Sequence, residues 1–426
     1  MSSMTTPAVA VQEAFGGVDT HKATHHGAVI DQGGQVVAEQ EFATTSAGCH
    51  ALVAWLGQWP VTRVGVEQTG TYGAALAREL TEAGCIVIDV NRPEVWVRAA
   101  HGKSDPIDAV MAADAVRTGR AAVIAKDRRG VIESVRYLHT TRGSAVQQRA
   151  TLLTQIGDLA ITAPAGLRDR LGTRNRDIVA ASLRLRPDRD RLAEPEQAAK
   201  IALRNTAERI HDLDTQIHAL DEDLSILLGQ IAPRLLERPF VGVNTAAQLL
   251  ITAGQNIDRI GSEAKFARLT GVAPIPASSG QTHRMRLHRG GDRAANAAIH
   301  LVAIGRLGRH QPAIDYVARR TQEGLSKKDI IRAMKRLIAR ELYGALKADC
   351  PASRTWQGFL GLKGGDRRVG VPQVHLEWPV PGQCFVWPGG VVLDPVLLGV
   401  LGEHERVVDL VDVEPLVLQG PEPAFA

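Results

Sequence analysis

The 426-residue sequence has few cysteines and no long hydrophobic run, and both absences exclude whole classes of protein. The four cysteines (Cys49, Cys85, Cys350 and Cys384) form no C-x-x-C pair, so neither a zinc site nor a disulfide framework is indicated. No uncharged apolar run approaches the roughly 18 residues that span a bilayer. The first residues, MSSMTTPAVAVQEA, lack the basic and then apolar pattern of a signal peptide. We therefore expect a cytoplasmic protein that makes no use of a membrane.

The net charge is only +4, but the charges are unevenly distributed along the chain. Residues 281–347 contain 15 Lys and Arg against 5 Asp and Glu, whereas residues 351–426 carry a net charge of −4. Such a basic concentration predicts a polyanionic partner such as nucleic acid. Ordinary solvated helix faces are the alternative explanation.

The chain divides into five predicted regions. After an extension at residues 1–14, residues 15–125 alternate strand-like and helix-like patterns, which predicts an α/β fold with a largely parallel sheet. The predicted strands cover residues 15–31, 35–44, 61–67 and 85–90, and the predicted helices cover 46–59, 71–84 and 105–119. Residues 126–236 are predicted to be helical and Arg-rich, and residues 237–347 mainly helical. Residues 348–426 form a Pro- and Gly-rich extension to which we assign no function.

A heptad pattern marks the second half of the middle region. Its apolar positions are Leu203, Ile210, Leu213, Ile217, Leu220, Leu224, Leu227 and Ile231. From Ile210 onward the spacing alternates between three and four residues, which is typical of a coiled-coil seam and favours self-association. An amphipathic helix packed within one chain explains the same pattern equally well.

Two acidic residues lie in apolar strands. Asp19 follows Gly17 and Val18, and Glu67 ends the alternating segment that includes Val64 and Val66. A buried charge costs several kcal/mol unless it is paired or bound to a metal, so both acids require an explanation. Functional residues of α/β sheets gather at the carboxyl ends of neighbouring strands.

Two further acids, Asp105 and Asp108, begin a predicted helix in the stretch GKSDPIDAVMAADAVRTG. Asp at the N-cap, Pro at N1 and an acid at N3 all suit a helix start, so capping alone explains them on local grounds. However, positions i and i+3 share a helix face, and that face could complete a cluster with Asp19 and Glu67. Four carboxylates without cysteine suit Mg²⁺ or Mn²⁺, which can support phosphoryl transfer.

A serine-containing basic loop is the second candidate site. The stretch PIPASSGQTHRMRLHRGGDRAAN places Ser278, Ser279 and Gly280 before a run of bases. The arginines that we expect to contact nucleic-acid phosphates are Arg284, Arg286, Arg289 and Arg293, together with Lys103 in the first domain. A loop that only binds backbone phosphates is the alternative to a serine nucleophile, because serine must be activated before it can attack.

The order of the acids resembles the RNase H-like fold of RuvC-type Holliday-junction resolvases. A more specific resemblance comes from the motifs GVDTHK, VEQTGTYG, NRP and GKSDPIDA. In this order and spacing they resemble the DEDD transposases of bacterial insertion sequences, which include the Piv-type invertases. The stretches FARLTGVAPIPASSG and RLHRGGDRAANAAIH resemble the C-terminal domain of the same family. The resemblance covers roughly residues 15–347, but RPFVGVN departs from the family's usual PGVG turn, and the tail has no counterpart.

The resemblance implies a transposase that recombines DNA and contains a RuvC-like catalytic domain, a coiled-coil middle and a C-terminal serine domain. It implies that Asp19, Glu67, Asp105 and Asp108 are catalytic and hold Mg²⁺ or Mn²⁺. It also implies that the serine before Gly280, Ser279, is the nucleophile, with Ser278 as its rival. The expected partners are element and target DNA, a bridge RNA that guides the enzyme, and further copies of the chain forming a dimer and then a tetramer. A nucleoid-associated location follows from these partners.

Three rival functions remain at this point. A metal-dependent nuclease or junction resolvase would use the four acids and water alone. An actin-like ATPase or sugar kinase would need a second phosphate loop, which we do not find. A non-enzymatic nucleic-acid-binding protein would explain the basic charge but not the acids within strands.

Overall fold

The computed structural model describes residues 13–90, 104–278, 285–349, 385–386 and 392–393. These residues group into two compact units. Unit 1 combines the chain up to Ser134 with Leu249–Ala273 and Arg289–Asp292, and unit 2 contains the remainder. Within this described part of the chain, none of the helices combines the length and the apolar character that crossing a bilayer requires.

Unit 1 is built on a five-stranded sheet in the order β3-β2-β1-β4-β5. Its strands are β1 (Ala14–Thr20), β2 (Thr24–Asp31), β3 (Val36–Ala43), β4 (Val61–Glu67) and β5 (Ile86–Val90). The first three strands pair antiparallel, whereas β1, β4 and β5 run parallel. The predicted α/β character of the first region is therefore confirmed. The prediction of a largely parallel sheet was wrong, because β1, β2 and β3 follow one another as antiparallel neighbours and make the sheet mixed.

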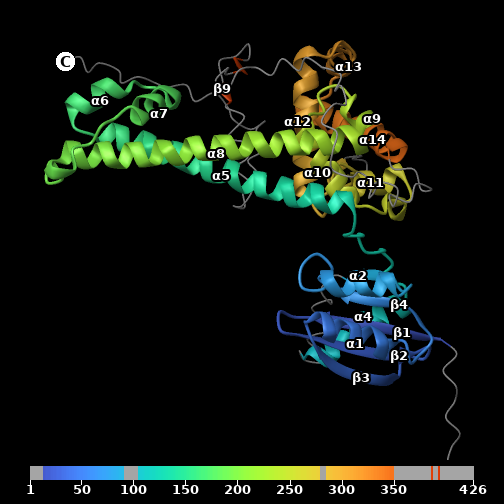
Figure 1. The fold of residues 1–426 in the computed structure, drawn as a ribbon. Coiled ribbons are helices and arrows are strands. Elements are labelled where there is room, and N and C mark those ends of the chain that lie inside the picture. Colours follow the sequence, from blue (N-terminus) through green and yellow to red (C-terminus); the bar gives the residue numbers. More distant parts are fainter. Residues whose placement is uncertain (1–12, 91–103, 279–284, 350–384, 387–391, 394–426) are drawn as a thin grey trace, which may run out of the picture. The chain divides into compact units, whose positions relative to one another are not determined.

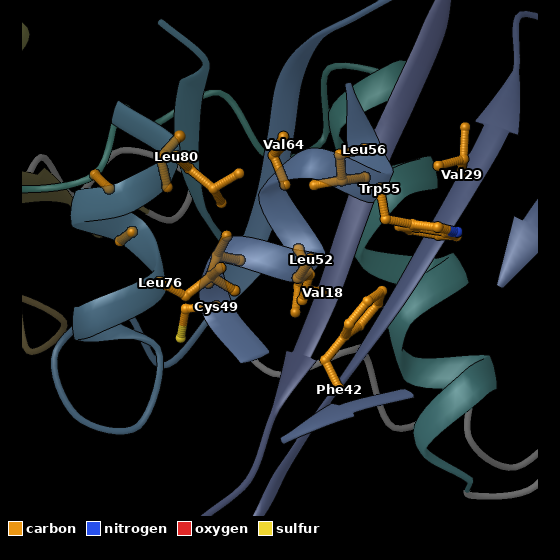
Figure 2. Close-up of a cluster of buried hydrophobic side chains, with 14 of the residues drawn as sticks. Val18, Val29, Phe42, Cys49, Leu52, Trp55, Leu56, Val64, Leu76 and Leu80 are labelled. Carbon is orange, nitrogen blue, oxygen red and sulfur yellow. The ribbon is translucent and has the colours of Figure 1, made fainter. Parts of the chain in front are cut away.

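Helices cover both faces of this sheet. On one face, α1 (Ser46–Leu56) and α2 (Ala74–Glu82) enclose an apolar cluster that includes Val18, Leu52, Val64 and Leu80 (Figure 2). On the other face, α4 (Asp105–Arg117) packs across β1, β2 and β4 and buries a second cluster that includes Ala113. Burial on both faces explains why strand β1 is apolar at almost every position.

Two predictions about β1, β2 and α1 were wrong. The single strand predicted for residues 15–31 is a β-hairpin, because the chain turns at His21–Ala23, where the His21 N–H donates to the Thr24 carbonyl oxygen at 3.0 Å. The cap of α1 is Thr45, whose hydroxyl accepts from the Gly48 N–H at 3.1 Å, rather than Ser46.

Unit 2 contains two long helices that lie side by side (Figure 1). They are α5 (Val131–Thr162), whose first turn belongs to unit 1, and α8 (Pro195–Ile231). Arg142 pairs with Asp221 and Arg149 with Asp214, so the helices run antiparallel. The short helices α6 (Ala165–Leu171) and α7 (Asn175–Leu183) and the 3₁₀ turn η1 (Arg189–Arg191) connect them.

The heptad positions of α8 are used in part within the chain. Leu203 and Ile210 are buried in a cluster with Leu152 and Ile156 of α5, while Leu213 packs on its edge. The heptad residues Leu213, Ile217 and Leu220 are only half-buried, so their exposed parts can pack against another helix. Packing within one chain is thus observed, and self-association along this helix stays a prediction.

The rest of the described chain is mainly helical, as predicted for residues 237–347. Its helices are α9 (Pro233–Leu236), α10 (Val243–Ala253), η2 (Ile257–Ile260), α11 (Glu263–Leu269), α12 (Arg293–Arg309), α13 (Gln311–Gln322) and α14 (Lys327–Asp349). Strands β6 (Pro274–Pro276) and β7 (Met285–Leu287) pair antiparallel in the stretch predicted to be non-helical. Strands β8 (Phe385–Val386) and β9 (Val392–Leu393) form a separate two-stranded pair in the tail.

Candidate active site

Asp19 and Glu67 lie at the carboxyl ends of two neighbouring parallel strands. Val18 of β1 is in register with Val66 of β4, so the acids occupy the next position of each strand. Only 3% of Asp19 and 4% of Glu67 is exposed to solvent. The Thr20 hydroxyl donates to the Glu67 carbonyl oxygen at 3.0 Å and ties the two strand ends together. The sheet therefore brings these two predicted residues to one edge.

A glycine stands two residues before each of these acids, at a strand position that belongs to the same face of the sheet as the acid. A Cβ at Gly17 would lie 2.1 Å from the Ala109 carbonyl oxygen, and one at Gly65 would lie 2.6 Å from that of Ala112. Both carbonyls belong to α4, which can approach β1 and β4 only because no side chain intervenes. Because side chains alternate along a strand, Asp19 and Glu67 face α4.

Asp105 and Asp108 begin α4 on this face. The N-cap is Ser104 rather than Asp105, so the capping explanation for Asp105 was wrong. The Ser104 carbonyl oxygen accepts from the Asp108 N–H at 3.0 Å and closes the first turn. Only 2% of Asp108 is exposed, whereas the side chain of Asp105 remains 43% exposed. The helix start thus presents one buried and one accessible carboxylate.

The electrostatics of Asp19 show that these charges lie close together. Burial raises the pKa of Asp19, and the neighbouring carboxylates of Asp108 and Asp105 raise it further, while His21 opposes the shift. A raised pKa means that the fold disfavours the ionised form in the absence of a compensating cation. Three predicted acids therefore share one electrostatic environment, with Glu67 on the adjacent strand.

The loop after Glu67 reverses the chain abruptly. Gln68 has a φ of 50°, which is a left-handed conformation that residues with side chains rarely adopt. Its carbonyl oxygen accepts from the N–H groups of Thr71 and Gly73. The Thr69 hydroxyl donates to the Asp89 carboxylate at 2.5 Å and fixes the loop to β5. Backbone strain of this kind is typical of functional sites.

His21 joins the acids, although no sequence pattern favours it over an ordinary strand-edge residue. Its Nδ1 lies 3.4 Å from Oδ2 of Asp19 and 3.8 Å from Oδ2 of Asp105. The available signal was its position two residues after Asp19, but that spacing indicates a shared face only if the strand continues. The strand instead ends at Thr20 and turns.

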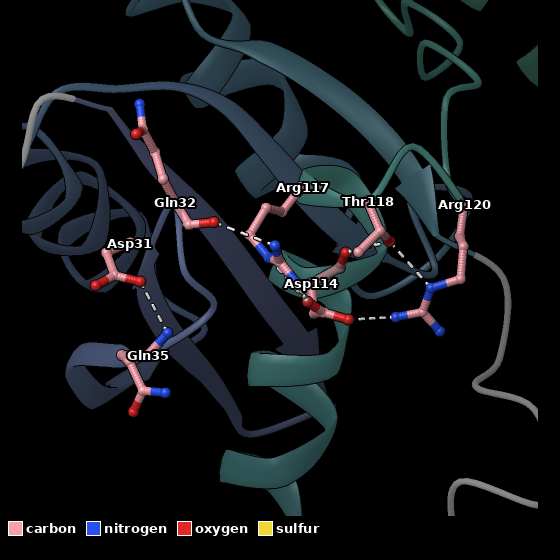
Figure 3. Close-up of polar contacts among 7 residues, drawn as sticks. All are labelled: Asp31, Gln32, Gln35, Asp114, Arg117, Thr118 and Arg120. Atoms are coloured by element: carbon pink, nitrogen blue, oxygen red, sulfur yellow. Dashed lines mark hydrogen bonds and ion pairs between the residues drawn. The ribbon is translucent and has the colours of Figure 1, made fainter.

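Asp114, also on α4, belongs to a different cluster (Figure 3). Its carboxylate accepts from Arg117 at 2.7 Å and pairs with Arg120, and Arg117 also donates to the Gln32 carbonyl oxygen at 3.1 Å. These contacts tie the end of α4 to the turn between β2 and β3. Asp114 therefore has a structural role as an ion-paired acid.

The predicted serine loop is described only in part. Ser278, two residues after the end of β6, is exposed, whereas Ser279, Arg284 and Lys103 lie outside the described residues. Arg286 on β7 is exposed, as are Arg289 and Arg293.

The base of this loop is held within unit 1. The Asp292 N–H donates to the Leu269 carbonyl oxygen, and the Thr252 hydroxyl donates to the Asp292 carboxylate, both at 2.7 Å. A Cβ at Gly291 would lie 2.3 Å from the Gly271 nitrogen, so the two segments of chain touch there.

Two family models match this chain. The model of the DEDD transposases of IS110, described as "Transposase", matches residues 16–160. A second model, described as "Transposase IS116/IS110/IS902 family", matches residues 232–318. Together the two matches cover more than half of the sequence and include both candidate sites. The chain belongs to the IS110 family of DEDD transposases.

Two relatives of this IS110-family transposase extend the similarity along most of its length. One is "Insertion element IS110 uncharacterized 43.6 kDa protein" of Streptomyces coelicolor, which is 25% identical over 382 residues. That alignment covers 78% of this chain and 94% of the relative. The other is "Insertion element IS900 uncharacterized 42 kDa protein" of Mycobacterium paratuberculosis, which is 24% identical over 79% of this chain and 96% of the relative.

The IS110-family assignment implies DNA transposition with a divalent metal ion, and the acids at the sheet edge fit such an ion. Among the described residues, no hydrogen-bond donor reaches the buried Oδ2 of Asp19. One ligand atom each from Asp19, His21 and Asp105 lies within 4.8 Å of the other two. Carboxylate oxygens are the ligands that Mg²⁺ and Mn²⁺ prefer, and the ion would offset the cost of burying Asp19.

Proposed function

We propose that this IS110-family transposase is a site-specific recombinase that cuts and rejoins DNA through metal-binding acids and a serine nucleophile. The observation that carries the proposal is the gathering of Asp19, Asp105 and Asp108 beside Glu67 at one edge of the sheet. We infer an RNase H-like, RuvC-like domain, and the strand order β3-β2-β1-β4-β5 with three antiparallel strands first supports this inference.

In this proposal the four acids hold Mg²⁺ or Mn²⁺. The bound ion would stabilise negative charge that develops on the phosphate during phosphoryl transfer. Asp19, Glu67 and Asp108 are buried, so they orient the site and exclude water from its inner side. Asp105 is the accessible carboxylate and faces the incoming nucleic acid. The close packing of α4 against the sheet keeps these roles fixed.

Ser279 is the proposed nucleophile, and Ser278 is its rival. The serine Oγ would attack phosphorus and lose its proton, while the DNA hydroxyl leaves with the electron pair of the broken P–O bond. Rejoining reverses the step, with a hydroxyl of the new partner strand displacing the serine. Arg284, Arg286, Arg289 and Arg293, with Lys103, would neutralise phosphate oxygens. The exposure of Arg286, Arg289 and Arg293 supports this role.

The proposed partners are element and target DNA, a guide RNA, and further copies of the chain. The basic stretch 281–347 supports a polyanionic partner. The Arg-rich connection between α5 and α8 supports a second nucleic-acid contact. The half-buried seam of α8 supports a homodimer that assembles further.

A trapping assay tests the proposal. The purified chain is incubated with element-end DNA, RNA transcribed from the element's flank and Mg²⁺, and denaturing gels are examined for a protein–DNA adduct. We expect an adduct in the wild type that disappears in Ser279→Ala and in Asp105→Ala, with Ser278→Ala as the matched control. Cleavage without an adduct in all variants would instead support a metal-dependent nuclease or junction resolvase that activates water.

A further inference from the structure

His21 is held in place by the backbone rather than by the acids that it faces. It is the first residue of the turn between β1 and β2, and its N–H donates to the Thr24 carbonyl oxygen at 3.0 Å. The Thr44 hydroxyl contacts the carbonyl oxygens of Lys22 at 2.9 Å and Ala23 at 3.2 Å, which pins the same turn from the end of β3. The backbone of His21 is therefore fixed, and its imidazole lies beside the acids.

The spacing of the three groups differs from that of a direct hydrogen bond. Nδ1 of His21 lies 3.4 Å and 3.8 Å from the nearest oxygens of Asp19 and Asp105, whereas N–H···O bonds measure roughly 2.7–3.2 Å. Ligands about 2.1 Å from an octahedral ion lie about 3 Å apart when adjacent and about 4.2 Å apart when opposite. Both observed distances fall between those limits, and the three atoms all lie within 4.8 Å of one another, so they group around one possible ion position.

We propose that Nδ1 of His21 is a nitrogen ligand of the divalent ion held by Asp19 and Asp105. This inference rests on the proposed function, in which the acids bind that ion. Imidazole nitrogen suits transition-metal ions, whereas Mg²⁺ prefers oxygen ligands and retains several waters. The site is therefore biased toward Mn²⁺ over Mg²⁺, and His21 is the residue that sets this preference.

The direct test detects nitrogen bound to Mn²⁺. The full-length wild-type protein is loaded with Mn²⁺, and pulsed electron paramagnetic resonance records whether ¹⁴N couples to the electron spin. We expect a ¹⁴N signal in the wild type that disappears in His21→Ala. The matched control is His26→Ala, because His26 pairs in register with Asp19 on β2 and is the alternative nitrogen donor. That variant is expected to keep the signal.

Affinity measurements give a second readout. His21→Ala should weaken Mn²⁺ binding by at least ~10-fold, because even residues that only support a ligand contribute about that much. Mg²⁺ binding should change by less than about 3-fold, since Mg²⁺ replaces the lost ligand with water. The ratio of the two affinities therefore falls in His21→Ala, and circular dichroism checks that this half-exposed turn residue leaves the fold intact.

The outcomes separate this inference from the proposed function. Mn²⁺ binding that Asp19→Asn abolishes, but without a ¹⁴N signal, would overturn the role of His21 and leave the acids as the metal site. The same holds if the signal survives His21→Ala or disappears in His26→Ala, or if both ions lose affinity equally. Absence of any ion binding sensitive to Asp19→Asn would overturn both proposals.

Discussion

At the scale of single residues, the burial of Asp19 lowers the stability of the metal-free fold at neutral pH. Asp19 is almost completely buried, and burial together with its acidic neighbours raises its pKa. The native state therefore holds the Asp19 proton to a higher pH than the unfolded chain, whose value is near 3.8. The stability that Asp19 contributes is present below about pH 3.8. It falls as the pH rises from there through the higher pKa of the native state, so it is low at neutral pH.

Asp19→Asn is accordingly expected to stabilise the metal-free protein at neutral pH, by ~0.5–2 kcal/mol if it behaves like other relieved functional sites. It should also abolish the stabilisation that Mn²⁺ gives the wild type, which is ~2.7 kcal/mol at a concentration 100 times the dissociation constant. Thermal unfolding with Mn²⁺ and with a chelator measures both effects. A lower midpoint for the variant in the chelator would contradict the prediction.

Lys126 is a second residue whose ionisation is linked to folding. Burial lowers the pKa of Lys126 to about 8, and the charges of Arg128 and Arg259 add to this effect. Its Nζ donates to the Ile251 carbonyl oxygen at 2.7 Å, close to the end of α10.

Between pH 8 and 10.5 the unfolded chain binds the Lys126 proton more tightly than the native state does, so rising pH favours the fold by up to ~1.4 kcal/mol per pH unit. We expect Lys126→Met to remove this gain. The thermal midpoint of the full-length protein, compared between variant and wild type across that pH range, tests the assignment. A difference that is independent of pH would count against it.

At the scale of secondary-structure elements, the site depends on how closely α4 lies against the sheet. Gly17→Ala should push α4 away, because the new Cβ would meet the Ala109 carbonyl oxygen at 2.1 Å and the Ala113 nitrogen at 2.3 Å. The expected cost is ~1–3 kcal/mol, as for other overpacked cores. Asp105 and Asp108 move with the helix, so Mn²⁺ binding and DNA cleavage should be lost as well.

The control for this variant is Gly57→Ala. Gly57 follows α1 in an ordinary helical conformation, and a Cβ added there would lie no closer than 3.4 Å to its nearest neighbour. We expect a change within about 0.5 kcal/mol and normal Mn²⁺ binding. Calorimetry and Mn²⁺ titration of both variants distinguish a specific effect at Gly17 from a general sensitivity to added methyl groups.

The elements were largely predictable from the sequence, but their ends were not. Patterns of apolar residues identified α1, α2, β4 and β5, and the glycine at position 84 marked the end of α2, because local patterns determine these elements. The turn at His21 was missed because the sequence THKA contains neither glycine nor proline. The Ser104 cap was missed because Asp105 followed by proline satisfies the same local rules.

At the scale of the whole molecule, sequence patterns identified two candidate sites but not the contacts around them. The rule about parallel strands predicted that Asp19 and Glu67 lie together, whereas the assignment of Asp105 and Asp108 to the same cluster rested on the family resemblance. The proximity of His21 could not, because it depends on a hairpin turn pinned by Thr44. Likewise, no local pattern indicates that Asp292 bonds to Thr252, forty residues away.

The basic stretch gives a whole-molecule prediction about salt. The logarithm of DNA affinity falls with the logarithm of salt concentration by roughly 0.9 for each phosphate neutralised. Arg286→Ala and Arg289→Ala, which remove exposed charges near the serine loop, should each reduce that slope by about 1. Arg204→Ala is the control, because Glu208 already pairs with Arg204 at 2.8 Å. Equal slopes in all three variants would show that the loop arginines do not contact phosphate.

The glycines that precede Asp19 and Glu67 also determine how errors in the gene would be tolerated. Every single-base missense change in a glycine codon introduces a side chain with a Cβ atom. Any such change at Gly17 or Gly65 places that atom 2.1 Å and 2.6 Å, respectively, from the backbone of α4. In a library of random point mutants selected for transposition, these two positions should therefore be depleted as strongly as the acids, although neither carries a reactive group.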